Sequence, residues 1–229
     1  MSKTTLVTFD VYMALLDIQG GLADAFAQAA SISTSEASGM VALWRAKQME
    51  RAASSNALAG SHTSFRDCTT MALSYVSKRH SLHIPADAVE LLIDAWAYLK
   101  PWPEADAALQ AIRAKGYQIA ILSNGDQAML DRVAAQFSTP FDHVFSAESA
   151  GFYKPHPSVY DLPKLKANIA TDATVHVAGS GNDVLGAVAY GMQCIWSNRV
   201  GDVLVDERFP PTHEVSQLGA IAQLLYLQP

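Results

Sequence analysis

The sequence predicts an α/β fold in which a Rossmann-like parallel sheet is flanked by helices, with a helical cap inserted after the first strand. Three observations lead to this prediction. The apolar run at residues 4–10 is too short and too β-branched to be a helix. Residues from about 18 to 99 have helical spacing and no convincing strand. From Pro103 onwards helices and strands alternate, which is typical of a parallel sheet covered by helices on both faces.

Helix signals divide the long helical stretch into segments. Ser33 and Glu36 form a plausible capping box at the start of one helix. Another helix is expected from Ser64 to His80. Pro85 suits the first turn of a third helix that continues to Leu99.

The second half of the chain supplies the remaining strands. A helix near 104–115 ends at Gly116, where a new strand can begin. The predicted strands of this half are residues 118–122, 143–146, 174–178 and 192–196. We therefore expect two units: a core made of residues 1–17 and 101–229, and a cap made of residues 18–100.

The composition excludes several classes of protein. The 229 residues are 50% hydrophobic and 17% charged, as in ordinary soluble globular proteins. A net charge of −6 without a Lys/Arg cluster argues against a nucleic-acid partner. No apolar run of about 18 residues and no basic leader is present, so we expect no membrane partner and a cytoplasmic location. Cys68 and Cys194 lack metal-ligand spacing and are expected to be reduced, buried thiols.

Four short polar motifs stand at or near the predicted strand ends. Asp10 ends the first strand, and Ser123-Asn124-Gly125 ends the second. Lys154 with its following proline precedes a helix, and the strand 174–178 leads to a polar loop that ends in Asp183. Ligands of parallel sheets bind beyond the carboxyl ends of the strands. We therefore expect these side chains to converge on one site.

Motifs of this kind and in this order resemble those of the haloacid dehalogenase (HAD) superfamily, and within it those of the (S)-2-haloacid dehalogenases. The resemblance spans nearly the whole chain. Its most specific part is the string LWRAKQ at residues 43–48, because it lies in the cap, where HAD subfamilies differ most. The other matching strings are Phe9-Asp10-Val11-Tyr12, Ile121-Leu122-Ser123-Asn124-Gly125, and Tyr153-Lys154-Pro155 with Val159-Tyr160.

The resemblance implies a metal-independent hydrolase without a cofactor, acting on a small anionic 2-substituted carboxylic acid. Asp10 would displace halide from the α-carbon of an (S)-2-haloacid, and water would hydrolyse the resulting ester to an (R)-2-hydroxy acid. We expect the Lys154 ammonium to lower the pKa of Asp10. Arg45 and Asn124 would cradle the departing halide. Ser123 and Lys154 would hold the substrate carboxylate. Relatives are often homodimers, which is an expectation for this chain as well.

The same resemblance supplies the remaining site residues. Asp183 completes the catalytic set. Ser180 and Asn182 are candidates to hold the hydrolytic water.

The histidines, including His156 and His176, have no spacing that suggests catalysis and are expected to be structural or surface groups. The predicted substrate-binding residues are Val11, Tyr12, Trp44, Met49, Phe65, Tyr160, Ser180 and Asn182. Tyr12, Trp44, Met49 and Phe65 would form an apolar wall around the alkyl group of the substrate, but packing in the cap core explains these four equally well.

Departures from the family pattern leave the leaving group open. The family's Gly-Thr pair is Met13-Ala14 here, and its Ser-x-Asn is replaced by Ala178 and Ser180. Loss of one positioned donor commonly costs ~10²–10³ in rate. Ring opening of azetidine-2-carboxylate by the same carboxylate attack is therefore an alternative. The presence of Arg45 and Asn124 counts against it, since a cation gains nothing beside a departing amine.

Two further alternatives are weaker. A HAD phosphatase needs carboxylates where this chain has Tyr12 and Gly179, so Asp10 and Asp183 would be a poor oxygen cage for magnesium. A non-catalytic HAD-fold binding protein would have little reason to retain the polar motifs together.

Overall fold

A computed structural model describes residues 5–58, 60 and 62–225, and it has the α/β architecture that the sequence predicts. Strands of the described residues form one parallel sheet in the order β3-β2-β1-β4-β5-β6. Edge strand β6 pairs with β5 and was not predicted, because three residues carry little pattern. The strands are β1 (Leu6–Phe9), β2 (Gln118–Ser123), β3 (His143–Ser146), β4 (Thr174–Ala178), β5 (Gln193–Ser197) and β6 (His213–Val215).

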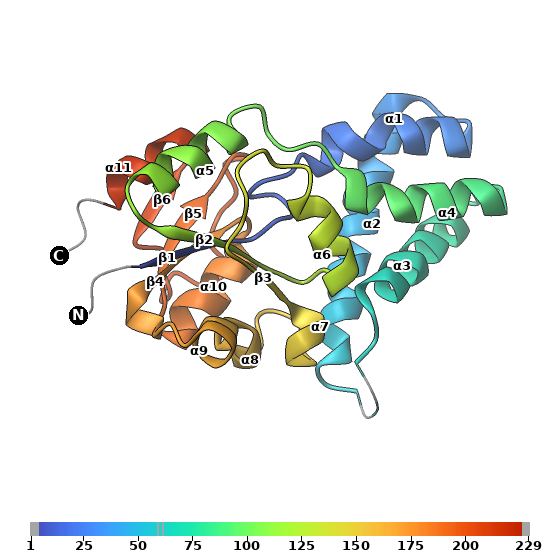
Figure 1. The fold of residues 1–229 in the computed structure, drawn as a ribbon. Coiled ribbons are helices and arrows are strands. Elements are labelled where there is room, and N and C mark those ends of the chain that lie inside the picture. The colour runs from blue at the N-terminus through green and yellow to red at the C-terminus, as the bar shows by residue number, and fades with distance from the viewer. Residues whose placement is uncertain (1–4, 59, 61, 226–229) are drawn as a thin grey trace.

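The central strands are mostly apolar because helices cover both faces of the sheet. All residues of β1 and β4 are buried. In Figure 1, α5 (Ala105–Ala114) and α11 (Ile221–Leu224) lie over one face, and α10 (Gly181–Tyr190) lies over the other with α8 (Pro157–Tyr160) and α9 (Leu162–Ala167). Helix α5 packs on β2, and α10 packs on β4 and β5. The shorter elements are α6 (Gln127–Ala134), α7 (Ala147–Ala150), η2 (Thr171–Ala173) and η3 (Leu218–Ala220).

The helices between β1 and α5 confirm the predicted helical stretch, and they lie to one side of the sheet (Figure 1). Helix α2 packs against both α1 and α3, and α1 also contacts α4. The capping box of Ser33 and Glu36 is present at the start of α2. The helices are α1 (Ile18–Ala30), α2 (Thr34–Ser55), α3 (Phe65–Arg79) and α4 (Ala86–Ala95), followed by the 3₁₀ turn η1 (Trp96–Tyr98).

The predicted helix through Leu99 was too long. Helix α4 starts directly after Pro85 and ends at Ala95. After the turn η1, Leu99 has an extended backbone with ψ of 138°. Pro101 disfavours the helical region at the residue before it, which explains why the helix stops short of this point.

Two polar contacts join the helical segment to the loops at the carboxyl ends of the strands. Asp126, in the loop after β2, accepts hydrogen bonds from the backbone N–H groups of Phe65 (2.7 Å) and Arg66 (2.9 Å) at the start of α3. Asn56, at the end of α2, exchanges two bonds of 2.8 Å with the backbone of Tyr153. The residues next to Ser123-Asn124 and Lys154 therefore hold the helical segment in place.

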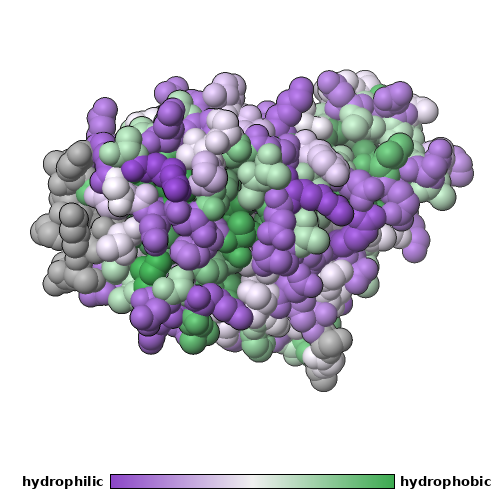
Figure 2. All heavy atoms as spheres, viewed as in Figure 1, coloured by the Kyte–Doolittle hydropathy of each residue, from purple (hydrophilic) through white to green (hydrophobic). Residues whose placement is uncertain are grey.

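The surface in Figure 2 is hydrophilic over most of the face shown. Within the described residues, no helix combines the length and apolar character needed to cross a membrane.

Candidate active site

Asp10 stands at the carboxyl end of β1. Its backbone N–H donates to the carbonyl oxygen of Val177 (2.9 Å), so its backbone is still tied to β4. Its Oδ1 accepts hydrogen bonds from Ser123 Oγ (3.2 Å) and Lys154 Nζ (3.4 Å). The side chain is only 12% exposed. The carboxylate is thus fixed at the sheet edge by one donor from β2 and one cation from the loop before α8.

Lys154 connects the predicted catalytic residues. Its Nζ lies 3.0 Å from Asp183 Oδ2 in addition to its contact with Asp10. Its backbone N–H donates to Asn124 Oδ1 (2.9 Å), which fixes the orientation of the Asn124 amide. The structure therefore brings Asp10, Ser123, Asn124, Lys154 and Asp183 together, as the motifs predicted.

Asp183 receives donors on both carboxylate oxygens. Tyr160 donates its hydroxyl to Oδ1 (2.9 Å), and His176 Nε2 lies 2.9 Å from Oδ2. The hydroxyl of Ser180 accepts from the Asp183 backbone N–H (3.3 Å) and so caps its own helix α10. Asn182 is exposed beside this buried group. A role for Ser180 or Asn182 in holding water stays a prediction.

His176 was missed as a site residue. It was expected to be structural or on the surface, but it is fully buried and contacts Asp183 and Lys154. The sequence did contain a signal, since Thr8 and His176 are polar residues in two otherwise apolar strands. In the structure they are paired in register between β1 and β4. His156, by contrast, accepts a hydrogen bond from Ser158 N (3.3 Å) at the start of α8, which is a structural role.

The two carboxylates differ in pKa. Burial raises the pKa of Asp10 above its ordinary value, the Lys154 charge opposes this, and Asp183 adds to it. Burial also acts to raise the pKa of Asp183, but Lys154 and His176 outweigh it and hold that pKa well below the ordinary range. Lys154 lowers the pKa of Asp10 as expected, but burial is the larger effect, so the pKa as a whole is raised.

Arg45 approaches from α2 on the opposite side of the site. Its guanidinium carbon lies 5.4 Å from the ring centre of Tyr12 and 5.7 Å from that of Trp96. Its Nη1 donates to Gln48 Oε1 (2.6 Å). Burial lowers the pKa of Arg45, and the Asp10 charge opposes this, yet an arginine stays protonated in proteins. Trp96 is a second residue that the sequence reasoning missed, since nothing in its spacing marks it.

Aromatic rings join Arg45 to the Asp10 loop. Tyr12 stacks on Phe65 with ring centres 5.6 Å apart and meets Trp96 edge-on at 5.7 Å. Its hydroxyl points to Met129 Sδ (2.7 Å). Burial raises the pKa of Tyr12 far above its ordinary value, so the phenol is neutral.

The remaining predicted wall residues are packed into the interior. Trp44 is fully buried and donates from Nε1 to the carbonyl oxygen of Thr69 (2.8 Å), in contact with Trp96. Val11 is fully buried and Met49 is partly buried against the core. Packing explains Trp44 fully, and substrate contact at these positions stays a prediction.

The residues do not fit a magnesium site of the phosphatase kind. A side chain at Gly179 would place its Cβ 2.6 Å from Ala14 N and 2.9 Å from Asp10 Oδ2, so no carboxylate can stand there. Tyr12 occupies the other carboxylate position. Among residues 5–58, 60 and 62–225, no three His, Cys, Asp or Glu side chains are grouped to hold a metal ion.

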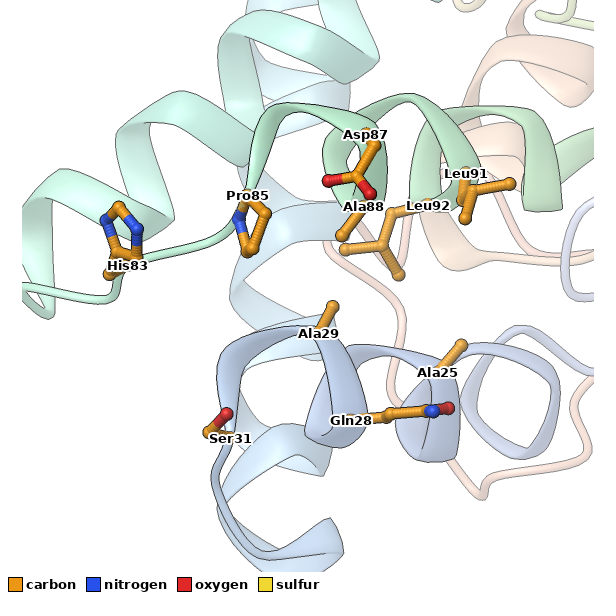
Figure 3. Close-up of a pocket in the computed structure, with 10 residues that line it drawn as sticks. All are labelled: Ala25, Gln28, Ala29, Ser31, His83, Pro85, Asp87, Ala88, Leu91 and Leu92. Carbon is orange, nitrogen blue, oxygen red and sulfur yellow. The ribbon is translucent and has the colours of Figure 1, made fainter.

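The larger of two cavities lies away from the polar cluster around Asp10. A cavity of about 490 Å³ lies between α1 and α4, and Asp87 is its one lining carboxylate (Figure 3). A smaller cavity of about 120 Å³ lies beside the Asp10 loop and is lined by Met13, Trp102, Gly179 and others. The smaller one adjoins the polar cluster.

Comparison with known proteins defines the class to which this fold and site belong. The family model of haloacid dehalogenase-like hydrolases matches residues 4–191. The chain therefore belongs to the haloacid dehalogenase-like hydrolases, which confirms the resemblance drawn from the motifs.

Several relatives within this class are named as dehalogenases. Haloacetate dehalogenase H-2 of Moraxella sp. (strain B) is 32% identical, over 98% of this chain and 99% of its own. An (S)-2-haloacid dehalogenase of Pseudomonas putida is 32% identical, with 96% of each chain covered. A crystal structure of an L-2-haloacid dehalogenase matches with a TM-score of 0.90 and 26% identity, covering 98% of this chain and all of the other.

Proposed function

We propose that this protein is a metal-independent hydrolase that displaces halide from the α-carbon of small (S)-2-haloacids and releases (R)-2-hydroxy acids. The observation that carries the proposal is the environment of Asp10, whose Oδ1 is held by Ser123 and Lys154. With Oδ1 occupied, Oδ2 is the oxygen that attacks. Gly179 supports the proposal, because it denies a second carboxylate the place beside this oxygen.

In the first step, Oδ2 of Asp10 forms a bond to the α-carbon of the substrate. The carbon–halogen bond breaks, and its electron pair leaves with the halide. Attack from the side opposite the halogen inverts the α-carbon. Arg45, stacked over Tyr12 and Trp96, stabilises the halide as its charge develops. Asn124 is the second group proposed for this role.

In the second step, water attacks the carbonyl carbon of the Asp10 ester. The bond between the carbonyl carbon and the ester oxygen breaks, so the α-carbon keeps its inverted configuration. One water is consumed overall, and the products are the hydroxy acid, halide and one proton. Asp183 has a low pKa and is a weak base, so its part in this scheme is to hold Lys154 in place.

The broader organisation is proposed on the same basis. Residues 18–100 act as the cap and residues 1–17 and 101–229 as the core, with Arg45 delivered to the site from the cap. The relatives' names support a haloacid as the small anionic substrate. The cytoplasmic location and the homodimer stay predictions.

Halide release from (S)- and (R)-2-chloropropanoate in metal-free buffer tests the proposal, with Asp10→Asn as the control. We expect release from the (S) form alone, a polarimetric signal for the (R) product, and loss of activity in the variant by at least about 10⁴-fold, as for other nucleophile removals. The thermal melt of the variant should be nearly unchanged or slightly higher, because a buried charge is removed.

Three outcomes would contradict the proposal, the last of them only in its leaving group. Retention of more than a few per cent of the turnover by Asp10→Asn would remove the covalent role of Asp10. Inhibition by EDTA that magnesium reverses would return the assignment to phosphatase chemistry. Absence of halide release, together with opening of azetidine-2-carboxylate, would keep the nucleophile and change the leaving group.

A further inference from the structure

Thr8 and His176 form a buried polar pair inside two otherwise apolar strands. They are direct partners in the register of β1 and β4, and neither is exposed. His176 Nδ1 lies 2.9 Å from Thr8 Oγ1. Burying such groups without partners costs stability, whereas valine or leucine would fill the same space at no such cost. The pair therefore calls for a role beyond packing.

The contacts of His176 indicate where its protons are. Nε2 lies 2.9 Å from Asp183 Oδ2 and 3.3 Å from Lys154 Nζ. Because the Lys154 ammonium has no lone pair to accept a bond and the Asp183 carboxylate has no proton to give, the shorter contact is an Nε2–H donated to Asp183.

Thr8 determines the other ring nitrogen. Its hydroxyl has two neighbours, His176 Nδ1 at 2.9 Å and the carbonyl oxygen of Val175 at 3.4 Å. Thr8 has one hydroxyl proton, and we assign it to the shorter contact, in which Thr8 donates to an unprotonated Nδ1. With this assignment, the ring carries its one proton on Nε2.

We propose that His176 is a positioning residue of this site: Thr8 fixes its Nε2–H form, and this N–H shares the Asp183 carboxylate with Lys154 so that the ammonium also stays beside Asp10. The catalytic consequence rests on the function proposed above. Lys154 is 3.0 Å from Asp183 and 3.4 Å from Asp10. Without the His176 donor, Asp183 would draw the ammonium closer and away from the nucleophile.

A withdrawn ammonium would change the titration of Asp10. Lys154 is the main charge that opposes the effect of burial on the pKa of Asp10, so the pKa of Asp10 would rise further. The groups that face the His176 ring are Asp183 from α10, Lys154 from the loop before α8, Tyr160 from α8 and Thr8 from β1. Cys194 is its neighbour in β5.

The protonation state is measured in the resting protein by NMR of isotope-labelled histidine, with His176→Gln used to assign the signal. We expect a neutral ring with the proton on Nε2 in the wild type, and loss of this single form in Thr8→Val. A neutral ring protonated on Nδ1, or an imidazolium at neutral pH, would overturn the proposal. This experiment needs no substrate, so it gives an answer even if the proposed dehalogenation fails.

The catalytic consequence is measured from the pH dependence of kcat/KM for halide release. His176→Leu should lower kcat/KM by about tenfold, the effect of losing one hydrogen bond to a charged group, and move the acid limb to higher pH. His176→Gln can still donate an amide N–H to Asp183 and should recover most of the rate and the position of the limb.

His143→Leu is the matched control, because it removes a histidine from strand β3, where the ring stacks on Phe145. We expect its profile to match the wild type. The proposal is overturned if His176→Leu leaves the acid limb in place, or if His176→Gln loses as much activity as His176→Leu, since either result would reduce His176 to a space-filling role.

Discussion

The two sides of the active site hold their charges in opposite ways. On the sheet side, Lys154 lies within ion-pair distance of both Asp10 and Asp183, and His176 adds a further donor to Asp183. On the helical side, Arg45 has one hydrogen bond, to Gln48, and two aromatic faces. Within the part of the chain that the structure describes, no carboxylate lies within 4 Å of the Arg45 guanidinium.

The two sides differ in whether their charges are already paired within the protein. Charges that satisfy one another keep a fixed geometry, which suits a nucleophile that must be aimed. Arg45 is partly buried and interacts with the Asp10 charge from beyond ion-pair distance, so a bound anion beside it would further offset the cost of burying the cation. Under the proposed function, the sheet side fixes Asp10 and Arg45 on the helical side is the group that stabilises the departing halide.

Lys154→Met tests the sheet side and should have the largest effect on stability. It leaves two carboxylates buried without their shared cation, which commonly costs about 3–5 kcal/mol of unfolding free energy. Urea unfolding at neutral pH measures this loss. The loss should shrink at acid pH, because protonated carboxyls no longer need a cation.

Lys164→Met is the control, since Lys164 is exposed on α9. It should change the unfolding free energy by less than about 0.5 kcal/mol. Equal stability of the two variants would show that Lys154 does not hold the two carboxylates together.

Arg45→Leu tests the helical side and should separate activity from stability. We expect the ester-forming step to slow by about 10²–10³-fold, the usual cost of losing a group that stabilises developing charge. The melting temperature should change little, because removal of a partly buried cation is offset by the loss of its hydrogen bond to the buried Gln48 and of its attraction to the Asp10 charge. Rapid-quench kinetics with mass detection of the ester on Asp10 measures the step.

Lys47→Leu provides the comparison on the same helix, because it removes a cation whose partner is Glu50 and which lies outside the site. Its ester-forming rate should equal that of the wild type. An undiminished ester burst in Arg45→Leu would remove the proposed leaving-group role, whatever the melting temperature.

The sequence predicted the strand ends well because parallel strands place their carboxyl ends at one edge. Asp10, Ser123 and Asp183 could be assigned to that edge without knowledge of the strand order. His176 could not, because its contact with Thr8 depends on β4 lying next to β1, whereas β2 follows β1 in the chain. The edge strand β6 was missed for lack of length.

Side-chain direction was harder to predict than position. Ser180 was a candidate for binding water, yet Ser180 and Asp183 have the spacing of a helix start, and the hydroxyl caps α10. Trp44 lies on α2 and Trp96 on the turn η1, but only the packing of α2 against its neighbours decides which ring faces Arg45. These side-chain directions are decided by tertiary contacts, which the spacing of residues along the sequence does not reveal.

The pH dependence should separate Asp10 from Asp183. Attack requires the Asp10 carboxylate, and burial raises its pKa above 3.8, so kcat/KM should fall with decreasing pH along a limb that lies above this value. Asp183 has a lowered pKa, so its contribution to stability is complete above 3.8 and is lost only as the pH falls below it. Activity should therefore disappear before this part of the stability does. Parallel profiles of kcat/KM and unfolding free energy check the order, and an activity limb below 3.8 would contradict it.

Substitution of Met13 should have the smallest effect on stability. Met13 stands where the family has glycine, and this departure was the hardest to interpret from the sequence. Its φ is 80°, a left-handed conformation that suits the glycine usual in the family, and its carbonyl oxygen accepts a hydrogen bond from Trp102 Nε1 (3.3 Å). A non-glycine residue in this region carries strain of about 1–3 kcal/mol, part of which glycine would lose again through the greater freedom of the unfolded chain.

Because Met13→Gly also removes a partly buried thioether, Met13→Ala is the matched comparison: it removes the same thioether and keeps the Cβ that causes the strain. We expect the glycine variant to be more stable than the alanine variant by about 1 kcal/mol in chemical denaturation. Equal stability would mean that the loop after Asp10 relaxes when Met13 is shortened. The backbone of the alanine variant would then carry no strain at position 13.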